Sequence, residues 1–376
     1  MVKIKLGDLC VPSAGQIKED AEELIDYFDI SSVDNETKKV TGFQTMSFGE
    51  SPSRARKAVK KGSILVSTVR PNLNAVALLE EDTPNISVAS TGFCILDCKE
   101  NVDNRFVFSF CKSKPFIDAM VSQATGASYP AVSDKIVRAA LVPKYTYEEQ
   151  CNISETLDKV SNVIDSRKAE LSALDDLIKA RFVELFGHPD TNEKGWKMNT
   201  FGDICTVRQG LQIPISKRLT EYDDDCYEYI TVQYLHGGKE REYIKSPKAT
   251  VICTKDDILM TRTGNTGLVV TGVEGVFHNN FFLIDFDRNR YDKDFLVQYL
   301  NLDTIQADIL RRAGTSTIPD LKHGEFYKIP VFEPLIGVQH QFKAFLKQVD
   351  KSKAAVQKAL DETQLLFDSL MQEYFG

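Results

Sequence analysis

The sequence predicts an α+β protein: two similar mixed α/β domains, separated by two long helices that form an antiparallel coiled coil, with a pseudo-two-fold relation between the halves. Three observations lead to this prediction. The stretch 1–187 recurs, much diverged, as 188–376. Each copy closes on a long heptad-like stretch that ends in Phe-Gly. Within each copy, strand-like and helix-like runs are mixed rather than strictly alternating, which is typical of α+β domains.

The repeat is visible as matched short motifs in the same order. Two copies are too few for a solenoid, so they indicate one molecule with internal symmetry. The matches are Gly7-Asp8-Leu9-Cys10 with Gly202-Asp203-Ile204-Cys205, Ile64-Leu65 with Ile258-Leu259, Phe93 and Asp97 with Phe281 and Asp285, Gly126 and Pro130 with Gly314 and Pro319, and Phe186-Gly187 with Phe375-Gly376.

The composition is that of a folded protein. A chain of 376 residues suffices for two cores of ordinary size, and its 42% apolar and 27% charged residues are ordinary proportions. No signal-like or membrane-length apolar run occurs, so we expect a cytoplasmic protein without membrane contact. The net charge of −8 argues against coating nucleic acid by bulk electrostatics. Any nucleic-acid contact therefore requires local basic surfaces.

The eight cysteines are scattered and form no C-x-x-C pair. Cys94 and Cys98 have no second pair of ligands at the spacing of a metal site. We therefore expect buried free thiols in a reducing compartment and no bound metal.

Each globular region shows a few clear secondary-structure signals. In the first domain, 1–147, the apolar runs 63–69 and 92–96 predict strands and 106–121 predicts a helix. In the second domain, 188–334, the strands are expected at 257–261 and 281–284 and the helix at 294–310. The shared order supports two copies of one fold.

The two long helices are expected at 148–187 and 335–376. Thr146 and Glu149 have capping-box spacing before the first, and Gly187 with Pro189 ends it. At about 38 residues and 1.5 Å per residue, each spans roughly 57 Å. The expected apolar seams are Leu157, Val160, Ile164, Leu171, Leu174 and Ile178 in the first, and Phe342, Phe345, Val349, Val356, Leu360, Leu366 and Leu370 in the second.

The chain order sets the direction of a helix pair. The first helix runs from domain one to domain two and the second starts at domain two, so pairing of their seams makes them antiparallel. Such a pair would act as a stiff rod. The alternatives are that each helix packs on its own domain or that the helices pair between chains.

Catalytic patterns are missing. The sequence has no triphosphate-binding G-x-x-x-x-G-K-[ST] loop, G-x-S-x-G elbow, H-E-x-x-H or Rossmann glycine pattern. It also lacks the Asn-Pro-Pro-aromatic motif of adenine methyltransferases. The triplet Glu36-Thr37-Lys38 matches part of a nuclease E-x-K pattern, at a frequency expected by chance. We expect a non-enzymatic chain that needs no cofactor.

Cationic and amide side chains cluster on turns next to the predicted strands, at matching places in both copies. Arg can bond guanine with two hydrogen bonds, and Asn or Gln can do so with adenine, while Ser, Thr and Lys can hold phosphates. Each such residue alone can equally be a solvated surface group or part of a plain turn. The candidates for DNA binding are Arg54, Arg56, Lys57, Lys60, Lys61, Arg70, Asn72, Asn74, Ser128, Tyr129, Arg208, Gln209, Lys248, Arg262, Asn265, His278, Asn279, Arg311, Arg312, Thr315 and Ser316.

A second matched element is the loop 125–130 and its counterpart 313–319, each followed by an apolar-Pro step into a long helix. Its repetition fits a structural joint as well as a DNA contact. Arg311 and Arg312 favour a backbone contact in the second copy.

Taken together, the chain resembles the specificity subunit of a type I restriction-modification system. The resemblance covers nearly the whole chain and rests on the order and duplication of individually weak motifs. These are the opening G-D-[LI] segment, the strand and loop Ile64 to Asn74, the G-[AT]-S-x-x-P-type loop, the apolar-Pro step, Gln150 and Gln339 near the helix starts, and the closing Phe-Gly.

The resemblance implies two target-recognition domains that each read one half of a split double-stranded DNA sequence, with the helical rod setting the unread spacer. It also implies partners: two methyltransferase subunits that modify adenines, joined by restriction subunits. It carries over no base-contacting residue. A rival hypothesis is a coiled-coil scaffold whose globular ends bind proteins or glycans.

Overall fold

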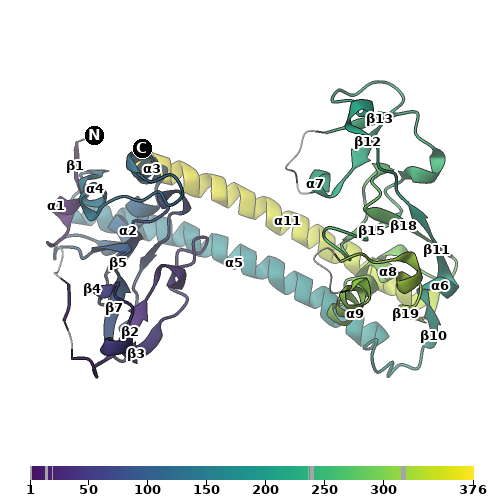
Figure 1. Cartoon of the computed structure of the whole chain (residues 1–376), viewed down its shortest axis with the longest axis horizontal. Coiled ribbons are helices and arrows are strands. Elements are labelled where there is room, and N and C mark those ends of the chain that lie inside the picture. The colour runs from purple at the N-terminus through teal and green to yellow at the C-terminus, as the bar shows by residue number, and fades with distance from the viewer. Residues whose placement is uncertain (1, 13–15, 19, 236, 238–240, 315–318) are drawn as a thin grey trace. The chain divides into compact units, whose positions relative to one another are not determined.

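The computed structural model describes the chain except residues 1, 13–15, 19, 236, 238–240 and 315–318 (Figure 1). The chain forms two compact units, unit 1 from Met1–Ala169 and Gln357–Gly376 and unit 2 from Glu170–Val356. Each unit thus contains a globular part, the first portion of the long helix that follows it, and the last portion of the other long helix. None of the described helices is long and apolar enough to cross a membrane.

In its described residues unit 1 contains three sheets, with strand orders β3-β2-β7-β4, β6-β5-β8 and β1-β9. Its strands are β1 (Lys3–Lys5), β2 (Leu24–Phe28), β3 (Gln44–Ser47), β4 (Ala55–Ala58), β5 (Ile64–Ser67), β6 (Val76–Leu78), β7 (Ile86–Ser90), β8 (Phe93–Leu96) and β9 (Leu141–Pro143). Its helices are α1 (Leu6–Leu9), α2 (Asn104–Lys112), α3 (Lys114–Gln123), α4 (Asp134–Ala139) and the start of α5 (Tyr147–Phe186).

Unit 2 also contains three sheets, with orders β13-β12-β17-β14, β11-β18-β15-β16 and β10-β19. Its strands are β10 (Lys197–Thr200), β11 (Cys205–Gln209), β12 (Cys226–Ile230), β13 (Tyr243–Lys245), β14 (Ile252–Cys253), β15 (Ile258–Thr261), β16 (Val269–Val270), β17 (Gly275–Phe277), β18 (Phe281–Phe286) and β19 (Pro330–Glu333). Its helices are α6 (Phe201–Ile204), α7 (Val232–Leu235), α8 (Lys293–Leu300), α9 (Asp303–Ala313), α10 (His323–Phe326) and the start of α11 (Ile336–Phe375).

The two units share their strand pairings, which confirms the repeat. The pairs β2–β7 and β12–β17 are parallel, and the central pairs β5–β8 and β15–β18 are antiparallel. Phe93 pairs with Ser67 as Phe281 pairs with Thr261, so the predicted Phe93–Phe281 match is also a structural one. One difference is that β11 pairs with β18 over five residues, whereas at this place unit 1 has a single bridge between Cys10 and Cys98.

Two of the predicted helices are each divided into two. The region 106–121 contains α2 and α3, because Ser113 adopts an extended backbone and caps α3 and Pro115 lacks the amide hydrogen that would continue the helix. The region 294–310 contains α8 and α9, which are separated at Leu302, another residue with an extended backbone. Helical periodicity continued across both breaks, so the pattern alone did not reveal them.

Helix α5 begins as predicted. The Thr146 backbone N–H donates to Glu149 Oε2 at 2.7 Å, and the Glu149 N–H donates to Thr146 Oγ1 at 3.3 Å. This reciprocal pairing satisfies backbone donors that a helix start leaves free. Helices α5 and α11 each contain 40 residues, close to the expected length.

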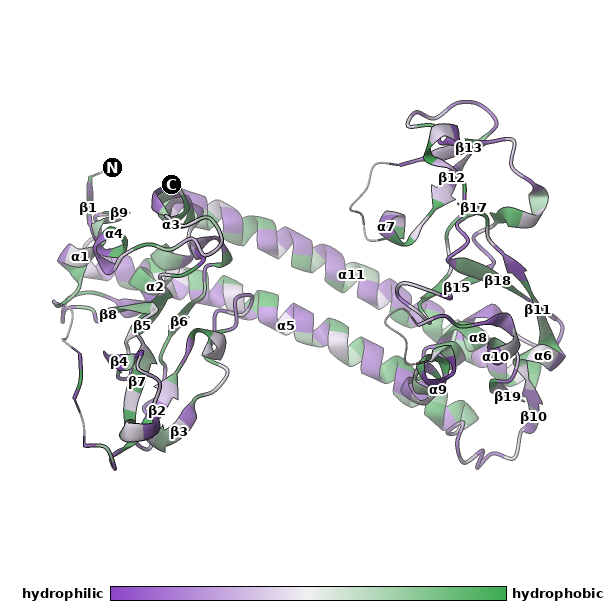
Figure 2. Ribbon diagram, in the orientation of Figure 1, coloured by the Kyte–Doolittle hydropathy of each residue, from purple (hydrophilic) through white to green (hydrophobic). Residues whose placement is uncertain are grey.

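Within each unit the two long helices pack side by side in opposite directions. In unit 2 the C-terminal part of α5 meets the N-terminal part of α11, with Phe182 and Phe342 rings 5.4 Å apart and Lys353 Nζ 2.6 Å from Asp175 Oδ1. In unit 1 the last residues of α11 pack with Leu157 of α5 in one hydrophobic core. Figure 2 shows apolar residues recurring along both helices.

The predicted seam of α11 is wrong at one position. Leu366 is 51% exposed, whereas Phe367 packs against the core of unit 1. From Leu360, steps of three and four residues lead through Thr363 to Phe367, so Leu366 falls on the outer face.

The ends of the long helices complete the cores. Phe375 is fully buried with Phe106 and Phe110, at ring distances of 5.4 and 5.9 Å. Phe186 is fully buried in unit 2 against Phe295, at 4.9 Å. The closing Phe of each copy therefore packs in the globular core of the other copy.

A buried glutamine near the start of each long helix ties it to its globular part. Gln339 Oε1 accepts from the Asp292 N–H at 2.8 Å, and its Nε2 donates to the carbonyl oxygens of Arg290 (3.0 Å) and Pro334 (2.8 Å). Gln150 accepts from the Asp103 N–H and donates to the Tyr145 carbonyl, both at 3.1 Å. The two glutamines that carried part of the resemblance are thus structural links.

Replacing Gln339 with Leu is expected to lower the free energy of unfolding by about 2–4 kcal/mol, because it leaves three backbone groups without partners in a buried place. Gln150→Leu removes two such bonds and should cost less. Urea unfolding checks both, with exposed Gln364→Leu on α11 as the control. Equal costs at the buried and exposed positions would contradict the argument.

Candidate nucleic-acid interface

In unit 1 the loop after β5 and the loop after α3 lie together. The Arg70 N–H donates to the Pro130 carbonyl at 2.7 Å, and isolated bridges join Ala131 to Val69 and Thr125. The Arg70 guanidinium lies over the Tyr129 ring, 5.0 Å from its centroid. The sequence treated these loops as separate candidates, and the fold makes them one surface.

This surface is exposed and carries a positive charge. Tyr129 is 68% exposed, and Arg70, Asn72 and Ser128 are also exposed. Among the described residues no carboxylate forms an ion pair with Arg70. Arg70 has a left-handed backbone with φ of 49°, which is uncommon for a residue with a Cβ. The stacked guanidinium keeps its hydrogen-bond donors, so it can approach a base or a phosphate.

The other candidates of unit 1 are differently placed. Asn74 is buried, and its amide donates to the Cys111 carbonyl at 3.1 Å. Lys57 Nζ is held by Asp134 Oδ2 at 2.6 Å and the Phe93 carbonyl at 2.7 Å. Both side chains therefore serve internal contacts.

Four more basic residues lie in or beside strands β4 and β5. Arg54 pairs with Asp29 at 2.8 Å but remains 55% exposed, and Arg56 lies over the Phe48 ring at 4.8 Å. Lys60 and Lys61 are exposed at the start of β5, the opposite end of that strand from Arg70. They line a separate cleft.

In unit 2 the end of β15 gathers candidates from three places in the sequence. Arg262 forms a bidentate ion pair with Asp320, at 2.8 and 2.7 Å, and its Nη1 donates to Gln209 Oε1 at 3.4 Å. Gln209 Nε2 in turn donates to the Asn279 carbonyl. Asp320 is not among the residues that the sequence pattern predicts; the signal that the sequence carries for it is its place directly after the matched Pro319.

His278 and Asn279 complete this group. His278 Nδ1 accepts from the Asn280 N–H at 3.1 Å, and burial together with nearby Arg218 lowers the pKa of His278. Both effects favour the neutral form of the ring. Asn279 Oδ1 is buried and has no hydrogen-bond partner among the described residues.

Backbone contacts align the two loops with an offset. The Val132 N–H bonds to the Thr68 carbonyl in unit 1, and the Leu321 N–H bonds to the Arg262 carbonyl in unit 2. Arg262 therefore occupies the place of Thr68, and Arg70 lies two residues further into its loop. The two surfaces share these backbone hydrogen bonds, but the arginine stands at different positions in the two loops.

The remaining candidates of unit 2 are scattered. Lys248 and Asn265 are exposed, and the Arg208 guanidinium lies 3.4 Å from the Thr250 carbonyl. Arg311 and Arg312 at the end of α9 both pair with Asp308, and Arg311 stays 70% exposed. Thr315 and Ser316 lie outside the described residues.

Comparisons with known proteins agree with this architecture. Residues 193–363 match the family described as the type I restriction modification DNA specificity domain. The type I restriction enzyme MjaIX specificity subunit of Methanocaldococcus jannaschii is 23% identical over 195 residues, which cover 47% of this chain and 43% of that subunit. The match thus spans less than half of that relative's length.

Two solved structures have the same fold over the full chain. One, from a study of complex assembly and conformational transition in the type I R-M system, has a TM-score of 0.64 at 20% identity and covers 100% of this chain and 97% of that one. The other, the S subunit of a type I restriction-modification system from M. genitalium, has a TM-score of 0.60 at 16% identity and covers 100% and 96%. Residues 193–363 thus match the type I restriction modification DNA specificity domain, and the chain as a whole has the fold of these two solved structures.

Proposed function

We propose that this chain is a non-catalytic, sequence-specific DNA-binding subunit that reads a bipartite target, one half with each unit. The observation that carries the proposal is the pair of loop surfaces after β5 and β15. They occupy the same place in one fold yet carry different side chains, as expected for two readers of different sequences.

The chemistry of the two surfaces suits base recognition. Arg70 presents its guanidinium next to Tyr129, and Arg262 presents the N–H groups that Asp320 and Gln209 do not engage; a guanidinium can read base edges in the major groove. Exposed Lys and Arg around them suit phosphates. Because the chain is acidic overall, we infer that partner subunits supply much of the electrostatic attraction to DNA.

We further propose that α5 and α11 continue their antiparallel contacts as one coiled coil that relates the two units by a pseudo-two-fold and sets the DNA spacer. The antiparallel packing within each unit and the reciprocal burial of Phe186 and Phe375 support this idea. Under this proposal, residues 1–147 and 188–334 are the two recognition domains, and residues 148–187 and 335–376 are the two spacer helices.

The proposed partners are double-stranded DNA, two methyltransferase subunits, and the restriction subunits of the full complex. The decisive experiment assays methylation by the methyltransferase subunits with and without this chain, followed by sequencing of the modified sites. We expect modification at one bipartite motif only when the chain is present. Methylation that is the same in its absence would falsify the proposal.

Arg70→Ala is expected to weaken DNA binding by roughly 1–3 kcal/mol and to relax only the half-site that unit 1 reads, if Arg70 contacts a base. Arg70→Lys should relax it as well, since an ammonium cannot form the planar double contact. Binding to a library of half-site variants measures this, with Lys159→Ala on α5, which is exposed and is not a candidate, as a control in the same unit. A loss that is uniform across sequences would instead mark a phosphate contact.

In unit 2, the effect of replacing Arg262 can be compared with the effect of replacing its ion-pair partner Asp320. Arg262→Ala should relax the other half-site by a similar amount. Asp320→Asn removes the carboxylate that holds Arg262 and should alter the base preference there without affecting the first half-site. Changes in both half-sites would contradict independent readers.

A further inference from the structure

Cys10 and Cys98 face each other on neighbouring antiparallel segments of unit 1. The Val11 N–H bonds to the Asp97 carbonyl at 2.8 Å, and the Lys99 N–H bonds to the Leu9 carbonyl at 3.0 Å. These bonds flank the cysteine pair, so Cys10 and Cys98 occupy a non-hydrogen-bonded position, where opposite Cα atoms are about 4.5 Å apart and side chains are closest. This separation lies within the range of about 4.4–6.8 Å found for disulfides.

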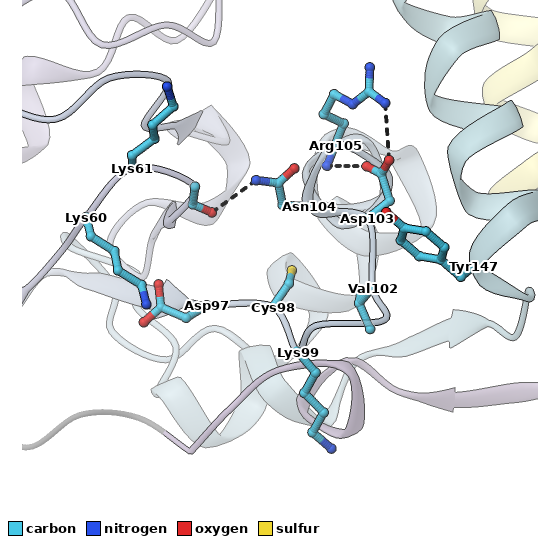
Figure 3. A pocket seen from close by; sticks show the side chains of 11 residues that line it. Lys60, Lys61, Asp97, Cys98, Lys99, Val102, Asp103, Asn104, Arg105 and Tyr147 are labelled. Atoms are coloured by element: carbon cyan, nitrogen blue, oxygen red, sulfur yellow. Dashed lines mark hydrogen bonds and ion pairs between the residues drawn. The ribbon is translucent and has the colours of Figure 1, made fainter.

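The two thiols differ in access. Cys10 is 2% exposed, whereas Cys98 is partly exposed and lines a cleft of about 460 Å³. Figure 3 shows the Cys98 side chain between Lys60 and Lys61 on one side and Asn104 and Arg105 on the other. An external reagent can therefore reach Cys98 first, and Cys10 is placed behind it.

The cleft has a positive balance. Its lining includes four basic residues, Lys60, Lys61, Lys99 and Arg105, and two acidic ones, Asp97 and Asp103. Both carboxylates are engaged: Asp97 accepts from Ser63 Oγ at 2.5 Å, and Asp103 pairs with Arg105 and caps α2. An anionic reagent is thus favoured over a cationic one.

The surroundings also support reactivity of the pair. The hydrogen bond between the two thiols, together with the charges of Arg138 and Lys99, lowers the pKa of Cys10, and the same hydrogen bond together with burial raises the pKa of Cys98, so Cys10 is the readier of the two to lose its proton and can accept that of Cys98. In contrast, burial raises the pKa of neighbouring Cys94 to about 12 and also raises that of Cys111. Since the thiolate is the reacting form, the latter two cysteines are poor competitors.

Unit 2 lacks this arrangement at the equivalent place. Cys205, the counterpart of Cys10, faces Phe286 in the register of β11 and β18. The counterpart of Lys99 is Asp287, whose N–H bonds to the Ile204 carbonyl as that of Lys99 bonds to Leu9. Among the described residues the thiol pair therefore belongs to unit 1 alone and is not a requirement of the fold.

We propose that Cys10 and Cys98 form a redox-active thiol pair, which an anionic low-molecular-weight disulfide entering the basic cleft converts into an intramolecular disulfide. Cys98 passes its proton to Cys10, and Cys98 Sγ attacks one sulfur of the small disulfide, which breaks that S–S bond, forms a mixed disulfide and expels one thiolate, which takes the proton from Cys10. The Cys10 thiolate then attacks Cys98 Sγ, forms the Cys10–Cys98 bond and expels the second thiolate. Two protein thiols are oxidised, one small disulfide is reduced to two thiols, and those thiols take up the two protons.

The test exposes the reduced full-length chain to glutathione disulfide, blocks the remaining thiols and identifies linked tryptic peptides without reduction. We expect peptides 6–18 and 62–99 joined through Cys98, and release of the link by a dithiol. The variant Cys94→Ser should behave as wild type, Cys10→Ser should retain a mixed disulfide at Cys98, and Cys98→Ser should leave Cys10 unmodified. Absence of the link in the wild-type chain, or a link through Cys94, would overturn the proposal.

A second measurement tests the role of the basic cleft. Lys60→Glu with Lys61→Glu should slow the reaction with glutathione disulfide by about tenfold, within the range of electrostatic effects on encounter rates. The reaction with neutral bis(2-hydroxyethyl) disulfide should be almost unchanged. Equal slowing with both reagents would show that the cleft does not select for negative charge, and so would overturn that part of the proposal.

Discussion

Removal of one heptad from each long helix, residues 167–173 of α5 and 353–359 of α11, is expected to shorten the preferred DNA spacer by about three base pairs. Seven residues at 1.5 Å each remove about 10 Å of helix, and three base pairs occupy about the same length. The loss of modification at the original spacing should be nearly complete, because only one half-site can then be engaged at a time.

Methylation of a DNA library with varied spacers, read by sequencing, measures the shift. Both helices must be shortened together, because the two deleted stretches lie opposite each other in the antiparallel helix pair. The Asp175–Lys353 ion pair and the Phe182–Phe342 ring contact set this alignment. Deletion of two residues from each helix is the control, since two residues account for about 200° of rotation; their removal turns the apolar seams away from each other and should abolish activity at every spacing. An unchanged spacer after the heptad deletion would show that the helices do not set it.

Replacement of Phe375 by Ala is expected to destabilise unit 1 by about 3–5 kcal/mol, the usual cost of truncating a fully buried phenylalanine. Its ring contacts Phe106 and Phe110, and no part of it is exposed. Phe186→Ala should have a cost of the same size in unit 2, where the ring contacts Phe295 and Phe342.

Hydrogen exchange during urea unfolding distinguishes the two units. Phe375→Ala should lower protection mainly in unit 1 and Phe186→Ala mainly in unit 2, although each residue belongs to the other copy in the sequence. Leu365→Ala is the control, because Leu365 is 68% exposed on the same helix as Phe375 and should cost less than about 0.5 kcal/mol. Loss of protection confined to the residue's own sequence copy would contradict the packing described.

The prediction of the elements succeeded where a local signal was strong. The strands at 63–69, 92–96, 257–261 and 281–284, the capping box of α5 and the lengths of the long helices follow from short-range patterns, and the structure confirms them. The helices at 106–121 and 294–310 were predicted as single elements because the breaks at Ser113 and Leu302 interrupt the backbone without interrupting the apolar pattern.

The candidate site was less predictable than the fold. Residue type and position beside a strand identified Arg70, and the matched loop 125–130 identified Tyr129; both lie on one exposed surface. The same criteria also selected Asn74 and Lys57, whose side chains are bonded within the fold. A polar side chain on a turn has similar local sequence context in both situations, so only its three-dimensional neighbours distinguish them.

The amino-acid sequence by itself determined the duplication, the order of the elements and the apolar faces that must be covered, because these depend on periodicity and on residues close together in the chain. The folded structure was needed to show which surface covers each face. It places Phe375 against Phe106, Asp320 against Arg262 and Cys10 against Cys98, pairs that are 269, 58 and 88 positions apart in the sequence. Such contacts depend on which distant segments pack together. The periodicity of a segment shows which of its faces is apolar or charged, but it does not specify which other segment will contact that face.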